Sequence, residues 1–408
     1  MKEEYGQMLA FLDARLAART RGFDLFSREL LATFLRAFAG NTKTVYVSGY
    51  AFPTELLWAF DVVPFDFEIA CNNLPAAASG QGSTIMKIAE GEGWPLDMCS
   101  FDRLIIGCSI AGELPPGDLF LTSSYYCQGK AKANEIVAAG QGRRSVLFDV
   151  PNERSPEALA YVTAQLRDIA GMLEEVTGTK LDMDRLREAI RSANRARAAM
   201  LSLNAAMKAR PCPWDGTKAC LLSLAGAIFW GSPVLERIYG LLRAEIEERI
   251  AAGKVLPENR RILWFPWVPV QPTNIFPFLK ERRISIPMVE VAAVWWSELD
   301  EERPFEALAG KALENYLLGP ASRRARSLTA MAKEYGVDGA IHFATPACHH
   351  ENAAFRIIAD ALREEGIPVL HLEGDMTDER KYSPARTADL LDSFVGMIEE
   401  APRRESAS

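Results

Sequence analysis

The sequence predicts an α/β protein with two doubly wound parallel-sheet domains of the Rossmann-like type and a helical region between them. Three observations lead to this prediction. Strand-like and helix-like segments alternate in the first third of the chain, the alternation returns in the last third, and the stretch between them carries helical patterns alone. Such alternation is typical of a parallel sheet with helices on both faces. We therefore expect an N-terminal α/β domain at residues 1–154, a helical region at 155–256 and a C-terminal α/β domain at 257–408.

In the N-terminal unit, short apolar or β-branched runs bounded by turn residues indicate buried strands. They are TKTVYVSGY (42–50), DRLIIGCSI (102–110), GDLFLTSSYY (117–126) and RSVLFDVP (144–151). A short helix is expected at PTELLWAFDV (53–62). A longer helix is expected to begin after Cys127 and to stop at Gly140.

The later segments follow the same reasoning. The helical region shows apolar residues at helical spacing within 155–178, 181–210 and 232–253. In the C-terminal unit, strands are predicted within 260–270, 288–296, 337–347 and 367–375, and helices within 321–336, 352–366 and 385–400. Open parallel sheets bind ligands at the carboxyl ends of their strands, so two such units predict a binding cleft between them.

Composition and charge argue against several classes of protein. The chain has 408 residues and a net charge of −8, which disfavours nucleic acid or an anionic membrane as a partner. No run approaches about 18 uninterrupted apolar residues, and the amphipathic, partly acidic start is unlike a secretion signal. We expect a cytoplasmic protein that makes no use of a membrane.

Three of the seven cysteines lie at positions that suggest chemistry. Cys127 and Cys348 each end a predicted strand just before a helix, and Cys99 lies in a loop-like stretch. An odd number of cysteines disfavours a disulfide framework, and the absence of a CxxC pair disfavours a zinc ribbon. Three thiolates can hold three corners of an iron–sulfur cluster, whereas isolated buried cysteines can equally serve as small apolar residues. Position alone leaves both interpretations open.

Five segments resemble a known family, in the order in which the family has them. They are GYAFPTELLWAFDVVP (49–64), LDMCSFDR (96–103), TSSYYCQGKAKANEI (122–136), VDGAIHFATPACHHENAAF (337–355) and GIPVLHLEGDMTDER (366–380). Together they resemble the subunits of 2-hydroxyacyl-CoA dehydratases, with the D-component of 2-hydroxyglutaryl-CoA dehydratase among them, and of ATP-dependent benzoyl-CoA reductases. The resemblance runs from about residue 40 to 400 and includes three matching cysteines.

The resemblance implies that Cys99, Cys127 and Cys348 ligate one 4Fe-4S cluster. It also implies an acyl-CoA substrate, a heterodimer with a homologous second subunit, and an ATP-dependent activator protein that carries its own iron–sulfur cluster, all within anaerobic metabolism. In the dehydratases, one low-potential electron turns an (R)-2-hydroxyacyl-CoA thioester into a ketyl radical that expels its hydroxyl group. In the reductases, electrons enter an aromatic ring. Gln128 replaces the family's usual acidic residue after the second cysteine.

Three further residues are candidates for catalysis. Ser48 ends the first strand, where it can contact substrate or bond the backbone of a loop. Glu55, which the resemblance includes, can transfer a proton or complement a helix dipole. His349 follows a candidate cluster cysteine and can act as a general acid, while its neighbour His350 is expected in a supporting or solvent-exposed position.

Two further groups have both a functional and a structural interpretation. Tryptophans near predicted strand ends (264–272 and 294–296) can form an aromatic wall for an acyl group, or pack in the core. The basic helix start ASRRARS (321–327) can contact CoA phosphates or face solvent. No Walker A or GxGxxG pattern is present, so we do not expect the chain to bind ATP.

The leading hypothesis is the iron–sulfur subunit of a radical (R)-2-hydroxyacyl-CoA dehydratase. One alternative is a subunit of an ATP-dependent benzoyl-CoA reductase. Another is a non-catalytic subunit that relays electrons to its partner. An open, CoA-sized channel that reaches the three cysteines would distinguish the catalytic hypotheses from the relay.

Overall fold

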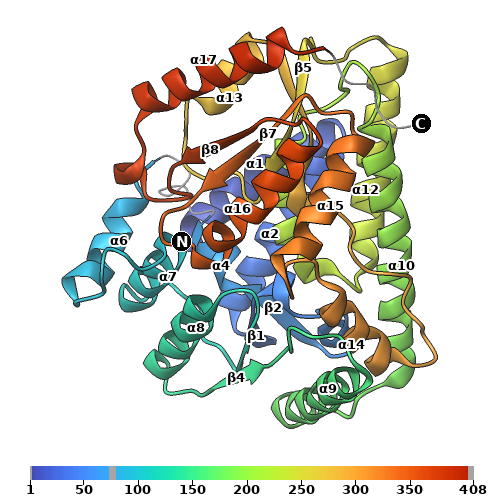
Figure 1. The fold of residues 1–408 in the computed structure, drawn as a ribbon. Helices are drawn as coiled ribbons and strands as arrows, with labels where there is room; N and C mark the ends of the chain where they lie inside the picture. Colours follow the sequence, from blue (N-terminus) through green and yellow to red (C-terminus); the bar gives the residue numbers. More distant parts are fainter. Residues whose placement is uncertain (1, 73–79, 403–408) are drawn as a thin grey trace.

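The computed structural model describes residues 2–72 and 80–402, and it shows two four-stranded parallel sheets among many helices (Figure 1). The first sheet has the order β2-β1-β3-β4, and the second has the order β6-β5-β7-β8. The strands are β1 (Lys43–Val47), β2 (Val62–Asp66), β3 (Leu119–Ser123), β4 (Ser145–Phe148), β5 (Arg260–Phe265), β6 (Ile284–Val289), β7 (Gly339–Ala344) and β8 (Val369–Glu373). The predicted fold class is confirmed.

Both sheets reverse their strand order at the same place, between the first strand and the third. In an open parallel sheet this switch point opens a crevice at the carboxyl ends of the two strands. The loops after β3 and β7 therefore lie where sheets of this kind commonly bind ligands. The same two loops carry Cys127 and Cys348.

The predicted strand at residues 102–110 is wrong, because these residues form helix α7 (Ser100–Ile110). Nearly all of α7 is buried, including Leu104, Ile105 and Ile106, so it lacks the polar face that reveals a helix in a sequence. A short apolar run does not distinguish a buried helix from a buried strand. The strand missed in this unit is β2, an edge strand whose Pro64 has no N–H to give to a ladder.

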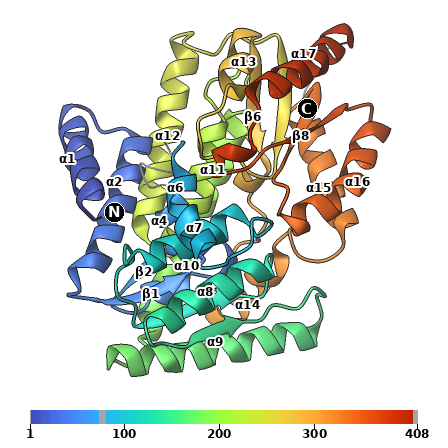
Figure 2. The ribbon, with the colours of Figure 1, turned by 90° about the vertical axis from the view of Figure 1, so that its left-hand side faces the viewer.

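The other helices of the N-terminal unit surround its sheet. They are α1 (Lys2–Ala18), α2 (Gly22–Ala39), α3 (Glu55–Trp58), α4 (Phe67–Asn72), α6 (Gly82–Gly91) and α8 (Gln128–Gly140). The predicted helix after Cys127 is confirmed as α8. In Figure 2, α6, α7 and α8 lie near one another on one side of the molecule.

Long helices fill the middle of the chain, as predicted. They are α9 (Pro156–Thr177), α10 (Met183–Ala206) and α12 (Pro233–Ala251). The shorter helix α11 (Thr217–Gly226) was not predicted. Ser155 and Ser232 cap α9 and α12 by accepting main-chain N–H hydrogen bonds, with proline at the start of each helix. In Figure 1, α10 and α12 run along the side of the molecule. The exact domain boundaries at 154 and 256 stay a prediction.

In the C-terminal unit, the predicted strand at 288–296 is largely wrong. Strand β6 ends at Val289 and a 3-10 turn, Glu290–Ala292, follows. Trp295 and Trp296 pack against Trp230 instead of joining the sheet. The helices of this unit are α13 (Ile275–Glu281), α14 (Pro304–Glu314), α15 (Ala321–Glu334), α16 (His349–Glu364) and α17 (Pro384–Glu400).

No helix in residues 2–72 or 80–402 combines the length and the apolar character needed to cross a bilayer.

Candidate functional site

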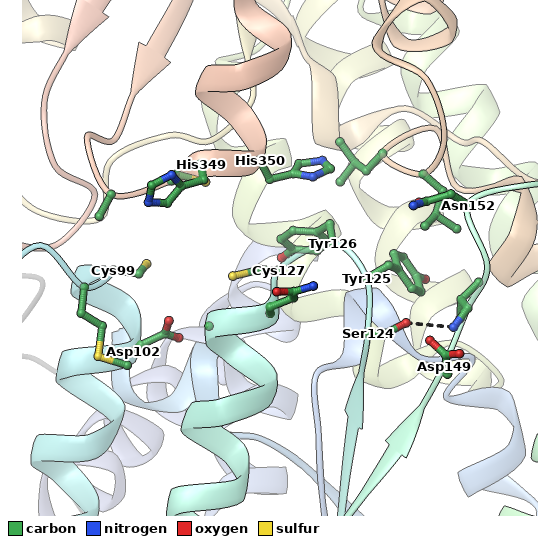
Figure 3. A pocket seen from close by; sticks show the side chains of 18 of the residues that line it. Cys99, Asp102, Ser124, Tyr125, Tyr126, Cys127, Asp149, Asn152, His349 and His350 are labelled. Atoms are coloured by element: carbon green, nitrogen blue, oxygen red, sulfur yellow. Dashed lines mark hydrogen bonds between the residues drawn. The ribbon is translucent and has the colours of Figure 1, made fainter.

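Three cysteines occupy the same local position in three different helices. Cys99 directly precedes α7, Cys127 precedes α8 and Cys348 precedes α16, so each is the N-cap residue of its helix. All three line one cavity, although they lie far apart in the sequence. In Figure 3, Cys99 and Cys127 lie on one side of this cavity and His349 on the other. The tertiary structure therefore brings the three predicted cysteines together.

The remaining cysteines lie outside this cavity. Cys71 is buried against Cys108, and Cys212 and Cys220 are buried in the helical region. None of these four residues lines the cavity. We interpret these four buried cysteines as small apolar residues of the core.

The three cysteines lie on the boundary between an outer and an inner cavity. The outer cavity has a volume of about 730 Å³ and the inner cavity a volume of about 90 Å³. Five residues line both cavities: Cys99, Asp102, Tyr126, Cys127 and Cys348. The thiols are therefore accessible from both cavities.

Burial and the helix starts act on the thiols in opposite directions. Burial, followed by the charge of Asp102, raises the pKa of Cys99 well above its usual value and also raises that of Cys127. Burial, followed by the charge of Glu351, raises the pKa of Cys348 to about 12. The sulfurs accept no capping hydrogen bond, but in each case the N–H three residues along the helix lowers the thiol pKa. The thiolate forms therefore need a positively charged partner.

The three thiols are too dispersed to hold a single metal ion. Within the described ranges, no group of three or more His, Cys, Asp or Glu side chains is arranged to grip one ion. The charges of Cys127 and Cys348 nevertheless contribute to the raised pKa of Cys99, so the three sulfurs are near neighbours. A polynuclear cluster spreads its ligands more widely than a single ion does.

Charged side chains form a polar wall of the inner cavity. Asp66, Asp102 and Lys130 are buried, and Glu68 is half-buried. Asp66 accepts hydrogen bonds from the N–H groups of Gly49 (2.9 Å) and Ile69 (3.0 Å). Burial, together with the charge of Glu68, raises the pKa values of Asp66 and Asp102 to about 7 each. Lys130 lies 4.5 Å from the ring centroid of Tyr126 and donates to the carbonyl of Tyr125.

Sequence reasoning missed this acidic wall. Asp66 is the last residue of the unpredicted strand β2 and Glu68 lies two residues further on, so the sequence did not reveal that they lie at a strand end. The signal was the segment FDFE (65–68), which places acids among buried aromatic residues. The rest of the inner cavity is apolar and includes Tyr50, Ile69, Phe101, Leu224, Trp267 and Met376.

The three candidate catalytic residues lie in different places. Ser48 is buried and donates to Glu68 (3.0 Å), which places it behind the polar wall of the inner cavity. His349 lines the outer cavity. Glu55 lines neither cavity, and it pairs with Lys311 (2.6 Å) in a buried ion pair. Their catalytic roles stay predictions.

His350 also lines the outer cavity, near the ring of Tyr126. Burial, followed by the charge of Arg324, lowers its pKa to about 4, so it is neutral at pH 7. Arg324 itself is buried and pairs with Glu290 (2.6 Å) and Glu351 (2.5 Å). Since Glu351 is in the first turn of α16, this ion triad fixes the helix start behind Cys348.

The predicted aromatic wall is present in part. Trp267 lines the inner cavity, and its ring lies 5.5 Å from that of Tyr126. Trp264 is fully buried, and its indole donates to the carbonyl of Trp267. Trp264 is therefore a core residue, as the structural interpretation expected.

Residues 50–398 match the model of the family described as 2-hydroxyglutaryl-CoA dehydratase, D-component. The chain belongs to this family. The match covers every strand of both sheets except β1, and it includes all three cysteines of the cavity. The predicted resemblance is thereby confirmed.

Relatives within this family have names of both expected kinds. A benzoyl-CoA reductase subunit of Thauera aromatica is 26% identical over 87% of this chain and 88% of its own length. The (R)-phenyllactyl-CoA dehydratase alpha subunit of Clostridium sporogenes is 25% identical over 76% of this chain and 79% of its own length. The beta subunit of the same dehydratase is 22% identical over 80% of this chain and 87% of its own length. The family thus includes both subunits of one enzyme.

Proposed function

We propose that the protein is the iron–sulfur subunit of a radical (R)-2-hydroxyacyl-CoA dehydratase, in which Cys99, Cys127 and Cys348 hold one 4Fe-4S cluster. One observation carries the proposal. Three N-cap cysteines from both α/β units converge on the boundary between a wide cavity and a small buried one. Family membership supports an acyl-CoA as the substrate class.

The residues present fit such a cluster. Three half-buried thiols need a cationic partner to ionise, and three helix starts direct their N–H groups toward them. Three ligands would leave the fourth iron of such a cluster open to substrate. When bound, the cluster supplies one low-potential electron to the thioester. A cavity of about 730 Å³ at the thiols supports a catalytic role over a pure electron relay.

The chain's own residues provide binding and proton handling. We assign the acyl group to the inner cavity, where apolar walls exclude water, and the rest of the thioester to the outer cavity. Burial raises the pKa of Asp66 to about 7, so this carboxyl can hold a proton at neutral pH. Asp66 is therefore a candidate donor to the leaving hydroxyl group, with the Ser48–Glu68 pair beside it.

The inner cavity favours small, neutral acyl groups. Its volume of about 90 Å³ is smaller than the cavity of about 150 Å³ that is known to hold benzene. Three acidic residues, Asp66, Glu68 and Asp102, outnumber the single Lys130 in its wall, which disfavours an acyl chain that ends in a carboxylate. A short 2-hydroxyacyl group fits these limits better than an aryl or glutaryl group does. A similar protein, 23% identical over 84% of this chain, is the alpha subunit of a lactoyl-CoA dehydratase.

The second candidate function is that of a subunit of an ATP-dependent benzoyl-CoA reductase. The observation that favours it is the 26% identity with the benzoyl-CoA reductase subunit of Thauera aromatica. In either case we propose a heterodimer with a homologous subunit, an activator protein that carries its own cluster, and a cytoplasmic location under anaerobic conditions. The alpha and beta subunit names of the relatives support a partner subunit.

Anaerobic purification with the neighbouring subunit and the activator tests the proposal. We expect Cys99→Ala, Cys127→Ala and Cys348→Ala each to lose bound iron and to lower turnover by at least about 100-fold, because each removes a ligand. Cys212→Ala is the matched control, because it removes a buried cysteine whose hydrogen-bond partners, Glu258 and Trp214, line neither cavity. Lactyl-, phenyllactyl-, 2-hydroxyglutaryl- and benzoyl-CoA are the substrates compared. Iron content that stays the same in all three variants would disprove the ligand assignment.

A further inference from the structure

A second cavity lies next to the outer one. The outer cavity includes Asn152, Leu317 and Leu318, and the same two chain segments continue into a cavity of about 310 Å³ that includes Arg154 and Tyr316. Gly319 lies between them, since a Cβ atom there would lie 3.2 Å from the Asn152 carbonyl oxygen and 3.8 Å from Cζ of Arg323. The two cavities are therefore neighbours along one wall.

Two guanidinium groups, those of Arg154 and Arg323, line this second cavity without a carboxylate partner, and the exposed Arg326 lies close enough for its charge to act on Arg323. Arg154 donates only to the main-chain carbonyls of Leu313 (2.9 Å) and Glu314 (2.7 Å). Arg323 donates to the carbonyl of Asn315, and its buried Nε has no partner. Neither these two arginines nor Arg326 forms an ion pair with any residue in the described ranges.

The positive charges of these arginines repel one another. Burial, followed by the nearby charges of Arg154 and Arg326, lowers the pKa of Arg323. The carboxylates at the cavity do little to offset this charge. Glu290 is already paired with Arg324, and Glu314 accepts the N–H of Ser297. A bound anion would reduce the electrostatic repulsion among the guanidinium groups.

An aromatic wall completes the cavity. The rings of Trp295 and Tyr316 lie 5.9 Å apart, and the buried indole N–H of Trp295 has no partner in the described structure. The first turn of α15 also lies here, because Arg323 is its third residue. Guanidinium groups beside an aromatic face match a ligand that joins phosphates to a purine ring.

We propose that Arg154, Arg323 and Arg326 bind the phosphate groups of the nucleotide end of acyl-CoA, with Trp295 beside the adenine. The identity of the ligand as acyl-CoA rests on the proposed function, whereas the anion site itself does not. The thioester would then extend along the outer cavity toward the cysteines. In this proposal the basic start of α15 contacts CoA phosphates, which was one of its two predicted roles. Arg324 is the exception, because it pairs with Glu290 and Glu351.

Binding measurements on the anaerobically purified complex test this site. The probes are 3′-phospho-ADP, which is the nucleotide end of CoA, inorganic pyrophosphate, and pantetheine without phosphate. We expect Arg323→Gln and Arg326→Glu each to raise the Kd for 3′-phospho-ADP by about tenfold or more, because each removes a charge-assisted contact. The Kd for pantetheine should not change. Arg326→Glu alters an exposed side chain, so it stays informative if Arg323→Gln does not fold.

Arg356→Gln is the matched control, since it removes an exposed arginine of the neighbouring helix α16. An unchanged Kd for 3′-phospho-ADP in both site variants would overturn the inference, even if acyl-CoA is still turned over. Loss of heterodimer formation with an unchanged nucleotide Kd would overturn it as well. If the wild type binds 3′-phospho-ADP through these arginines but converts no acyl-CoA, the site stands and the proposed function fails.

Discussion

Two opposing effects act on the pKa of each of the three thiols, those of Cys99, Cys127 and Cys348. Burial raises the pKa values of the thiols, while the N–H groups of the helix starts lower them. Burial dominates as long as the cavity holds no cation, so the free thiols stay protonated at neutral pH. A helix start of this kind is suited to a thiolate only when a cation completes the site.

His342 provides a second residue whose ionisation is controlled by its surroundings. Its Nδ1 lies 3.0 Å from Nδ1 of His371, and its ring stacks on Phe355. Burial, followed by the charge of His371, lowers its pKa from 6.5 to about 3. Folding therefore requires the neutral imidazole.

The sign of the pH effect follows from this shift. Between pH 6.5 and pH 3 the unfolded chain binds a proton at His342 that the folded chain does not, so stability falls as the pH falls. We expect His342→Gln to reduce this pH dependence by up to about 1.4 kcal/mol per pH unit. Urea unfolding at pH 7.5, 6 and 5 measures the free energy of unfolding of both proteins. The difference at pH 7.5 reports the effect of the altered packing alone, so it is subtracted from the differences at lower pH. Parallel profiles for the two proteins would contradict the assignment.

At the scale of elements, helix α7 depends on a close contact with its neighbour α6. A Cβ atom on Gly107 would lie 2.4 Å from the main-chain oxygen of Ile85, closer than any real contact. The absence of a side chain at Gly107 therefore lets the two helices approach each other. Because α7 begins directly after Cys99, this packing also positions one candidate ligand.

We expect Gly107→Ala to lower the free energy of unfolding by about 2 kcal/mol or more, because the added methyl group overpacks the contact. Gly171 is the matched control, since it lies inside α9 and a Cβ atom there would have no neighbouring atom within 4 Å. Gly171→Ala should raise the free energy of unfolding by about 0.5–1 kcal/mol through helix propensity. Urea denaturation of both variants tests the pair. A Gly107→Ala variant as stable as the wild type would show that the helices can separate without cost.

At the scale of the whole molecule, buried polar contacts hold the two α/β units together near the cysteines. Arg103, one turn after Cys99, pairs with Asp378 of the C-terminal unit (3.0 Å). Thr377 donates to Asn72 (2.8 Å) in the same region. The loop after β8 therefore fixes the helix that starts after Cys99. This arrangement lets cysteines from both units face one cavity.

A second buried bridge joins Glu55 of the N-terminal unit to Lys311 of the C-terminal unit. The ammonium group of Lys311 lies 3.5 Å from the ring centroid of Trp230. Burial lowers the pKa of Lys311 to about 8, and Glu55 opposes this shift. A bridge of this kind is costly to break on one side only, because the remaining charge is left buried.

We expect Glu55→Gln to destabilise the protein by about 3–5 kcal/mol, and the double variant Glu55→Leu/Lys311→Met to recover most of this loss. Thermal or urea unfolding measures both. A double variant no more stable than Glu55→Gln would argue against the ion pair as the cause. Turnover by a stably folded double variant then tests the predicted catalytic role of Glu55, since a catalytic carboxylate cannot be replaced by leucine.

Local patterns in the sequence were sufficient for much of the fold. Alternating apolar runs and helical spacing predicted every long helix of the middle region. They also predicted six strands, β1, β3, β4, β5, β7 and β8. They failed at α7 and at the end of β6, where burial on all sides removes the periodicity that separates helix from strand. They also missed β2, because its proline and its short length hide an edge strand.

The sequence by itself determined that Cys99, Cys127 and Cys348 stand at segment boundaries in family contexts. Only the tertiary structure decided that these boundaries meet, that they divide an outer from an inner cavity, and that Asp66, Glu68 and Lys130 line the inner cavity beside the thiols. It also decided that Glu55 forms an ion pair with Lys311, which lies 256 positions further along the chain. The physical reason is that periodicity records which side of one element is buried, whereas a site is made by elements distant in sequence, whose packing no local pattern encodes.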